Sequence, residues 1–522
     1  MNINRRNFLF GSAAAMTLAG RATEKVGLRP LKPGEKRTVA IIGLGKQGRN
    51  AMLSQFLRQT SVRVVCCCDC DETRAKDGAA RVDAKYKDGT PCAAEVDFRK
   101  VLANPAIDAV CIATPDHWHA YMSVEAMKRG KDVYCEKPLT FTIDEARKVI
   151  AAQKKYGRVF QTGSMQRSWS WLSEFRTACM IVRNGFVGDI KYVDANYGIG
   201  GKKLGGPSHP VRFFYDPEKA ENEVKGYEQL GEKGWDMWLG PAKYRPYSNK
   251  LAPADYKNEK RDGVHCWYPM FWRFDDDLGS GYNGDWGAHH LDIAQWGLDM
   301  DDSGPYRILR SDEPYSTNLY HGGRRQFGMR MLFKSKKDGS DIELYHGPFG
   351  VWGTVFYGTD GIVAVNRGKI AVWKGFDATA ARPDAALRQA VAEVTLNPDK
   401  IVAASVGKDY GTDSSAKKDD ALATALDTLV KTFALKTAPV QLYKSTNQVQ
   451  NFCECIETRQ PTVSPAEVGG RSGTLCLLCN LSYQYDTGFD WDGQAMDFPE
   501  GRAPKGISLA RAEYRNGWDV VV

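Results

Sequence analysis

The sequence predicts an α/β protein with an N-terminal doubly wound parallel sheet and a C-terminal α/β domain that carries a large open, mostly antiparallel sheet. Two observations support this. From Thr38 to about residue 160, short apolar strands alternate with stretches of helical periodicity, which is typical of a parallel sheet covered by helices. After about Gln161 the segments become longer and richer in aromatic residues, which indicates a second sheet that is mainly antiparallel.

Composition and charge exclude several classes of protein. The chain has 522 residues, of which 43% are hydrophobic and 26% charged, so it is neither collagen-like, nor of low complexity, nor wholly disordered. The net charge is +8 and no long basic block is present, so we expect no nucleic-acid partner. Beyond the N-terminus no apolar run is long enough to span a bilayer, and we expect no membrane span.

Residues 1–22 resemble a twin-arginine signal peptide. Arg5-Arg6-Asn7-Phe8-Leu9 precedes a small, apolar stretch, and no acidic residue occurs before Glu24. Phe10 stands where lysine is common in such signals, and a disordered basic tail is the alternative interpretation. Because this route exports folded proteins, the pattern predicts a periplasmic or cell-envelope protein whose cofactor is inserted in the cytoplasm. Residues 23–36, rich in Lys, Pro and Gly, are expected to form a linker.

The remaining chain divides into two predicted domains, residues 37–160 and residues 161–522. The first contains the predicted strands Val39–Ile42, Val62–Cys68, Ala109–Ala113 and Asp132–Cys135. The second contains the predicted strands Ile190–Tyr197, Gly328–Phe333 and Ile342–Tyr345, and helices over Asn451–Ile456 and Ser472–Leu481. Residues 376–440 are rich in Ala, Asp and Lys, and we expect them to form an inserted, partly helical excursion with Leu422, Leu426, Leu429 and Phe433 at helical spacing.

The thirteen cysteines do not form a convincing metal motif. Cys66-Cys67-Cys68 lies in a predicted strand, where neighbouring side chains point to opposite faces and cannot converge on one ion. Cys476 and Cys479 lie in an apolar stretch without a second paired motif. We therefore expect buried free thiols, kept reduced because the chain folds in the cytosol, and no structural metal.

A glycine-rich turn supplies the first functional motif. Gly43-Leu44-Gly45-Lys46-Gln47-Gly48 follows a predicted strand and opens a helical stretch, and Asp69 ends the next strand 21 residues beyond Gly48. Gly43 permits the tight turn, Gly45 lets the backbone approach a pyrophosphate, and Gly48 allows helix and strand to pack closely. This context predicts a Rossmann domain in which the turn binds a nicotinamide dinucleotide. Asp69 would accept hydrogen bonds from the adenosine ribose and repel a 2′-phosphate, which favours NAD over NADP.

Three further motifs carry a family resemblance. They are Thr114-Pro115-Asp116-His117-Trp118-His119-Ala120, Glu136-Lys137-Pro138-Leu139 and Asp285-Trp286-Gly287-Ala288-His289-His290-Leu291-Asp292. With them the chain, from Thr38 to the C-terminus apart from the excursion, resembles the Gfo/Idh/MocA family of sugar and cyclitol oxidoreductases. The resemblance implies a Rossmann domain, a second domain whose open sheet often forms oligomer interfaces, and hence a homo-oligomer, either dimer or tetramer.

The resemblance assigns Lys137 as the catalytic lysine, with Asp285 and His289 as an acid–histidine pair. Oxidation of a sugar hydroxyl requires that a proton leaves the oxygen while a hydride leaves the carbon. Neutral His289 can accept that proton. Asp285 at i−4 could orient the ring or relay the proton, and the Lys137 ammonium can stabilise the developing alkoxide. Structural interpretations remain open: Asp285 as a helix N-cap and Lys137 as a solvated loop residue.

The resemblance places a second group along the cofactor. It comprises Thr114, Pro115, His117, His119, Glu136 and Lys137. His117 and His119 could suggest zinc, but no other ligands lie within sequence reach, so cofactor contact or wall packing is the better interpretation. Arg167, Arg273 and Tyr282 are candidate substrate residues, since Arg binds hydroxyls or carboxylates and aromatic rings stack on pyranoses.

Three functions follow from these observations. The first is an exported oxidoreductase acting on a carbohydrate or cyclitol with tightly held NAD. The second is a redox-assisted glycoside hydrolase, in which transient oxidation acidifies the neighbouring C–H, the aglycone is eliminated, water adds and hydride returns. The third is a non-catalytic carbohydrate-binding relative. The Lys137, Asp285 and His289 motif favours the first.

Overall fold

The computed structural model describes residues 30–168, 173–196, 224–248, 251–252, 260–261, 264–265, 271–275, 277–281, 283–310, 329–347, 351–380, 382–407 and 419–522. The predicted signal at residues 1–22, the first half of the predicted linker (residues 23–29) and Tyr282 lie outside the described residues. Within the described part of the chain, no helix is both long and apolar enough to cross a bilayer.

The N-terminal domain is a six-stranded parallel sheet, as predicted, in the order β3-β2-β1-β4-β5-β6. Its central strands are almost wholly buried because helices cover both faces. The predicted strands at residues 62–68 and 132–135 are confirmed to the residue. The strands are β1 (Arg37–Ile42), β2 (Val62–Cys68), β3 (Ala93–Glu95), β4 (Ala109–Ile112), β5 (Asp132–Cys135) and β6 (Phe160–Thr162).

Helices α3 and α6 of this domain begin at capping side chains. Asp71 accepts hydrogen bonds from the Thr73 and Arg74 amides at the start of α3, and Thr142 and Glu145 form a capping box at the start of α6. A π-helical turn over Gln47–Met52 follows the glycine turn and continues into α2. The helices are α2 (Leu53–Phe56), α3 (Glu72–Tyr86), α4 (Phe98–Ala103), α5 (Asp116–Lys128) and α6 (Ile143–Tyr156).

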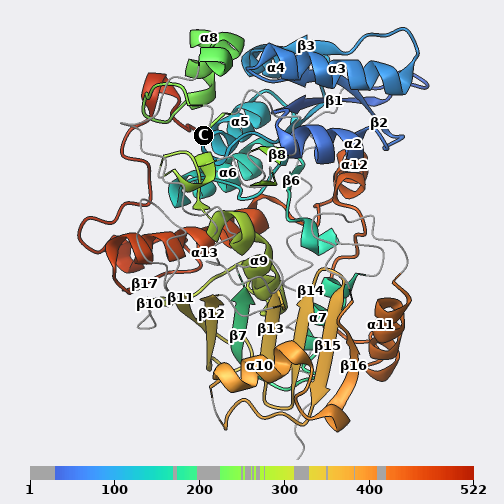
Figure 1. Ribbon diagram of the computed structural model, residues 1–522, viewed down its shortest axis with the longest axis vertical. Helices are drawn as coiled ribbons and strands as arrows, with labels where there is room; N and C mark the ends of the chain where they lie inside the picture. The colour runs from blue at the N-terminus through green and yellow to red at the C-terminus, as the bar shows by residue number, and fades with distance from the viewer. Residues whose placement is uncertain are drawn as a thin grey trace, which may run out of the picture.

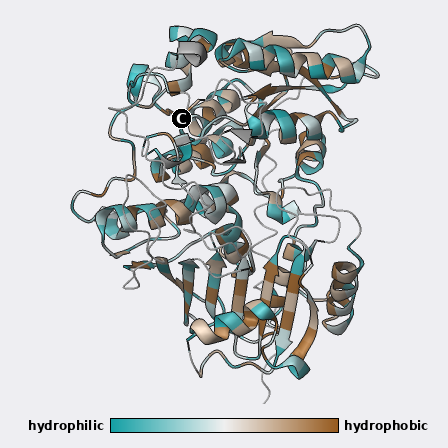
Figure 2. Cartoon of the chain, viewed as in Figure 1, coloured by the Kyte–Doolittle hydropathy of each residue, from teal (hydrophilic) through white to brown (hydrophobic). Residues whose placement is uncertain are grey.

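The C-terminal domain contains a nine-stranded sheet in the order β16-β15-β14-β13-β7-β12-β11-β10-β17. All neighbours are antiparallel except β7 and β12, which run parallel, so the predicted mostly antiparallel sheet is confirmed. Figure 2 shows hydrophobic residues concentrated along its central strands. The strands are β7 (Ile190–Asn196), β10 (Arg307–Leu309), β11 (Met329–Lys334), β12 (Asp341–Gly347), β13 (Thr354–Gly358), β14 (Gly361–Asn366), β15 (Lys369–Lys374), β16 (Ile401–Ser405) and β17 (Phe489–Asp490).

The stretch expected as an excursion at residues 376–440 extends the second domain. β16 pairs with β15 as an edge strand of the sheet. The helical spacing recognised in the sequence is confirmed, since Leu422, Leu426, Leu429 and Phe433 are all buried. The remaining helices of the domain are α7 (Glu174–Arg183), α8 (Val224–Leu239), α9 (Ala288–Gly297), α10 (Ala385–Glu393), α11 (Asp420–Thr432), α12 (Gln448–Thr458) and α13 (Ala466–Tyr485).

Helix α12 completes the core of the N-terminal domain although it lies near the end of the chain. Phe452 packs edge-on against Phe56 and Tyr134, with ring centroids 6.3 and 5.9 Å away. Val449 and Ile456 belong to the same buried cluster as the strands β1 and β2. The packing of the Rossmann domain therefore extends beyond residues 37–160, and in Figure 1 α12 lies beside α2.

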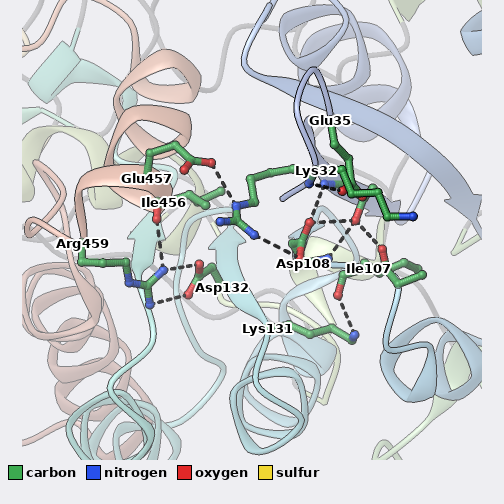
Figure 3. A network of polar contacts seen from close by, with 12 residues as sticks. Lys32, Glu35, Ile107, Asp108, Lys131, Asp132, Ile456, Glu457 and Arg459 are labelled. Atoms are coloured by element: carbon green, nitrogen blue, oxygen red, sulfur yellow. Dashed lines mark hydrogen bonds and ion pairs between the residues drawn. The ribbon is translucent and has the colours of Figure 1, made fainter. Parts of the chain in front are cut away.

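Ion pairs connect α12 and the segments just after it and before β6 to the sheet of the N-terminal domain (Figure 3). Asp132 begins β5, is fully buried, and accepts hydrogen bonds from Arg459 just after α12 and from Arg158 before β6. Arg37 at the start of β1 pairs with Glu457 of α12 and with Asp108 before β4. These groups lie at the amino ends of the strands, so they stabilise the edge of the sheet opposite the glycine turn.

The twelve cysteines among the described residues fit their sequence interpretation. Among the described residues all are free thiols, and all except Cys70 are buried. Burial raises the pKa of Cys66 to about 12, with smaller contributions from Cys92 and Glu95. The thiols therefore act as small apolar side chains within the core.

We predict that Asp132→Ala lowers the free energy of unfolding by about 3–5 kcal/mol, because removal of one member of a buried ion pair leaves uncompensated arginines. The matched control is Asp490→Ala, which removes an exposed ion pair with Arg307 and should cost about 0–1 kcal/mol. Chemical denaturation of both variants measures the difference. Equal losses in the two variants would show that the Asp132 network does not stabilise the domain.

Candidate active site

The glycine turn has the geometry that its sequence predicts. Gly43 has φ +89°, and a Cβ on it would lie 2.7 Å from the Ala113 carbonyl carbon. A Cβ on Gly48 would lie 1.8 Å from the Gly43 oxygen. A Cβ on Gly45 would meet only the Arg74 Nη1 atom, at 4.0 Å. The backbone is thus crowded at Gly43 and Gly48 but open at Gly45, which fits a pyrophosphate approaching the turn.

Asp69 lies at the end of β2 and is tied to the glycine turn. Its Oδ2 accepts a hydrogen bond from the Leu44 amide at 2.7 Å, and its Oδ1 accepts one from the Asp71 amide at 3.0 Å. Burial raises the pKa of Asp69, although Arg74 and the two amides oppose the shift. The carboxylate therefore orients the turn while it stands where an adenosine ribose binds in Rossmann domains.

The ends of β4 and β5 bring further predicted residues to the same edge. Glu136 follows β5, and its Oε1 accepts a hydrogen bond from Gln47 Nε2 at 3.0 Å. This bond connects the glycine turn to the segment that carries Lys137. Thr114 and Pro115 follow β4, and the Thr114 Oγ1 atom is buried without a hydrogen-bond partner. Lys46 lies within the turn. An open backbone at Gly45 and an orphaned hydroxyl nearby fit a bound dinucleotide.

The ring nitrogens of His117 and His119 contact backbone carbonyl oxygens at hydrogen-bonding distance. The ring of His119 contacts the Pro138 and Thr114 oxygens at 2.7 and 2.9 Å. Burial opposes protonation there, but contacts with Cys135, Asp116 and Pro138 raise the pKa of His119 to about 10. His117 contacts the Trp238 and Leu278 oxygens, and burial lowers its pKa to about 3. Both therefore support the wall of the site.

Lys137 and Asp285 meet across the two domains. The Lys137 Nζ atom donates to Asp285 Oδ1 at 2.7 Å and to the Asp285 carbonyl at 2.6 Å. Asp285 lies in a π-helical turn, Asn283–Gly287, that leads into α9. Burial would raise the pKa of Asp285, but Lys137, Arg273 and Arg367 outweigh it and lower the pKa to about 2. The carboxylate is thus ionised at any physiological pH.

His289 lies in the first turn of α9 with an unsatisfied ring nitrogen. The residue is 7% exposed, and its Nδ1 atom is buried without a hydrogen-bond partner. Its ring packs against Trp286 with centroids 5.7 Å apart. Burial, with the positive charges of Lys137 and Arg367, lowers the pKa of His289 well below its usual value. The imidazole is therefore neutral and able to accept a proton.

The expected link between Asp285 and His289 differs from the observed contacts. In the described part of the chain, the Asp285 carboxylate bonds to Lys137 and makes no hydrogen bond to the His289 ring. The i, i+4 spacing predicts both side chains on one helical face. The π-helical turn at Asp285 changes that relation, so the carboxylate orients the lysine instead.

Sequence analysis missed Arg367, which lies at the hairpin between β14 and β15. Its guanidinium stacks 4.8 Å above the Trp286 ring, and the residue is 1% exposed. With the Gln166 amide assigned the orientation that satisfies both neighbours, its oxygen accepts from Arg367 Nε at 3.3 Å and its nitrogen donates to the His289 carbonyl at 2.7 Å, which connects Arg367 to α9. The available signal was a cation in a turn between two strands whose central residues are apolar.

The three candidate substrate residues have different surroundings. Arg273 is partly exposed, stacks on Trp272 and lies 3.7 Å from the Asp285 carboxylate, so it belongs to the site. Arg167 is 2% exposed and is bound by Asp292 and Asp301, so the structure does not bring it to the site. Tyr282 lies outside the described residues.

The fold is a Rossmann domain joined to an α/β domain with a large, mostly antiparallel sheet. Residues 37–164 match the family model described as "Oxidoreductase family, NAD-binding Rossmann fold". Over that range the chain is similar to the Gfo/Idh/MocA family. The same edge of the Rossmann sheet carries the open glycine turn at Gly45 and the Lys137–Asp285 pair.

Named relatives cover only parts of both chains. An inositol 2-dehydrogenase from Rubrobacter xylanophilus is 34% identical over 219 residues, which are 39% of this chain and 60% of that protein. An alpha-N-acetylgalactosaminidase from Shewanella oneidensis is 27% identical over 218 residues, 38% of this chain and 46% of that protein. The crystal structure of an oxidoreductase domain protein from Kribbella flavida has a TM-score of 0.50 at 16% identity, covering 87% and 99% of the two chains, and shows the shared fold.

We predict that Arg367→Met raises the pKa values of His289 and His290, because one neighbouring positive charge that disfavours their protonation is removed. His346 is the internal control: burial alone lowers its pKa to about 4, without a contribution from Arg367. NMR titration of histidine-labelled protein measures all three rings. Unchanged His289 and His290 titrations, or an equal shift at His346, would contradict the assignment.

Proposed function

We propose that the protein is an exported oxidoreductase that transfers hydride between tightly bound NAD and a ring carbon bearing a hydroxyl in a sugar or cyclitol. The contact of Lys137 with Asp285 beside the neutral His289 carries this proposal. Relatives named as an inositol dehydrogenase and as a galactosaminidase support a carbohydrate-like substrate. Bound NAD would supply the hydride acceptor.

The side chains of the site have distinct tasks in this reaction. Asp285 fixes the Lys137 ammonium by binding it through both its carboxylate and its carbonyl. The ammonium, held in place, can donate a hydrogen bond to the substrate oxygen as negative charge develops there. The lowered pKa of His289 keeps its ring neutral, so the imidazole can receive the hydroxyl proton.

Cofactor preference and location are parts of the same proposal. Asp69 places a carboxylate at the end of β2, where it repels a 2′-phosphate, so NADH should bind more tightly than NADPH in a direct comparison of dissociation constants. The twin-arginine pattern at Arg5 and Arg6 supports export, which cell fractionation tests. An exported enzyme meets little free NAD, so the cofactor would be regenerated within each cycle. The sheet of the second domain favours a dimer or tetramer.

Glycoside hydrolysis is the second candidate function, favoured by the relatives named as glycosyl hydrolase family 109 proteins. It would use the same lysine and histidine, followed by elimination and addition of water. A carbohydrate panel in deuterium oxide separates the two. Cleavage of a glycoside with deuterium entering the ring supports hydrolysis, whereas an oxidised sugar without cleavage supports the oxidoreductase.

We predict that His289→Ala slows reduction of bound NAD about 100- to 10,000-fold, the usual loss when a positioned general base is removed. Lys137→Met should cause a comparable loss, because one donor to an oxyanion is worth about 3–4 kcal/mol. Single-turnover absorbance of the reduced nicotinamide measures both rates, with bound nucleotide quantified separately.

The matched control is Lys334→Met, which removes an exposed lysine paired with Asp341 on the second sheet. Its rate should equal that of the unaltered protein. Rates close to normal in both active-site variants, with NAD still bound, would show that Lys137 and His289 only support packing.

A further inference from the structure

Helix α8 of the second domain reaches the cofactor edge of the Rossmann sheet. Gln229 in α8 donates from Nε2 to Asp71 Oδ2 at 2.6 Å, and Asp71 lies two residues beyond the ribose-binding candidate Asp69. A Cβ on Gly234 would lie 3.2 Å from the Cys70 oxygen. α8 therefore contacts the Rossmann domain first at the segment that follows β2.

The carboxyl end of α8 contacts a different strand end. The Trp238 carbonyl accepts a hydrogen bond from Trp118 Nε1 at 3.1 Å and contacts His117 Nε2 at 3.0 Å. Both partners belong to the first turn of α5, which begins directly after β4. Trp235 and Trp238 stack with centroids 5.0 Å apart and are both buried, so this end of the helix is firmly packed.

The order of the strands shows that these two contacts of α8 lie on either side of the glycine turn. β2 and β4 flank β1, whose end carries the glycine turn. α8 is kinked at Gly231, whose backbone is not helical (φ +68°), so Gln229 lies before the kink, whereas Gly234 and Trp238 lie after it. Helix α8 therefore bridges the strand ends on both sides of the glycine turn. Figure 1 shows α8 near α4 and α5, next to the C-terminal segment.

The C-terminal tail, residues 509–522, binds to α8 and stabilises it in this position. Arg515 donates from Nη2 to the Asp236 carbonyl and from Nε to the Ala242 carbonyl, both at 2.9 Å, and it pairs with the Asp236 carboxylate. Asn516 also reaches the Asp236 carboxylate at 3.4 Å. These contacts hold the last turn of α8 and the residues that follow it.

The tail is itself attached to the Rossmann domain. The Trp518 ring packs against Trp118 and Phe98, with centroids 5.0 and 5.9 Å away. The Tyr514 hydroxyl donates to Glu145 Oε1 of α6 at 3.1 Å. The tail thus returns from the second domain to α5 and α6 and connects them to α8.

We propose that α8 and the C-terminal tail form a clasp that retains the dinucleotide, so that release requires α8 to separate from Asp71. The clasp rests on the proposed function, because it acts on the cofactor of that function. The hydrogen bond from Gln229 to Asp71 is the contact that breaks when the cofactor leaves. Arg515 is a positioning residue that keeps α8 in place. A clasp of this kind suits an enzyme that must keep one NAD molecule through many turnovers.

The test is the rate at which NADH leaves the loaded protein. NADH-loaded protein is mixed with excess NAD, and the fall in bound-NADH fluorescence gives the dissociation rate. Gln229→Ala and Arg515→Ala should each release NADH about tenfold faster or more, the change expected when a hydrogen bond to a carboxylate is lost. Gln229 lies at the partly exposed face of α8, so its variant should fold even where Arg515→Ala does not.

The matched control is Arg310→Ala, which removes an exposed arginine paired with Asp486 far along the chain from α8 and should leave the rate unchanged. Equal dissociation rates for Gln229→Ala and the unaltered protein would overturn the clasp while leaving the proposed function intact. A protein that binds neither NADH nor NADPH would overturn the proposed function, and the clasp with it.

Discussion

The bond between the Lys137 ammonium and Asp285 is the contact on which the site depends. It joins the end of β5 in the first domain to the turn before α9 in the second. A partly buried ion pair is stable only when its geometry is good and its remaining polar atoms are satisfied. Here one ammonium binds both the carboxylate and the carbonyl of a single residue, so a small relative displacement of the domains would break two bonds together.

Positive charge is concentrated around this bond. Lys137, Arg273 and Arg367 all lower the pKa of Asp285, and two of them also lower the pKa of His289. At Asp285 these charges outweigh burial and keep the acid ionised, whereas at His289 they add to burial, which is the larger cause of the lowered pKa. The protonation states that proton transfer requires are therefore set by the fold before substrate binds.

The Rossmann sheet and its glycine turn could be predicted from the sequence because they depend on local signals. Gly43 and Gly48 are required by backbone contacts within a few ångströms, and the parallel strands are short apolar runs between helices. Helix α12 could not be assigned to this domain, since its apolar face fits any core and its partners lie about 300 residues earlier or more.

The sequence motifs name the residues of the candidate site but predict their arrangement only in part. Motifs placed Lys137, Asp285 and His289 together, while the π-helical turn, which directs Asp285 toward the lysine, leaves no periodic signal. Arg367 comes from a hairpin 82 residues beyond Asp285, and only the folded sheet brings it to Trp286. Arg167 looked like a substrate residue because the sequence does not show that Asp292 and Asp301 enclose it.

The most direct test of the account is a crystal structure of the protein loaded with NADH. The account predicts that the pyrophosphate lies against the open backbone at Gly45 and that the nicotinamide ring reaches Lys137 and His289. A nicotinamide directed away from the Lys137–Asp285 pair, or a dinucleotide bound at another place in the molecule, would contradict it.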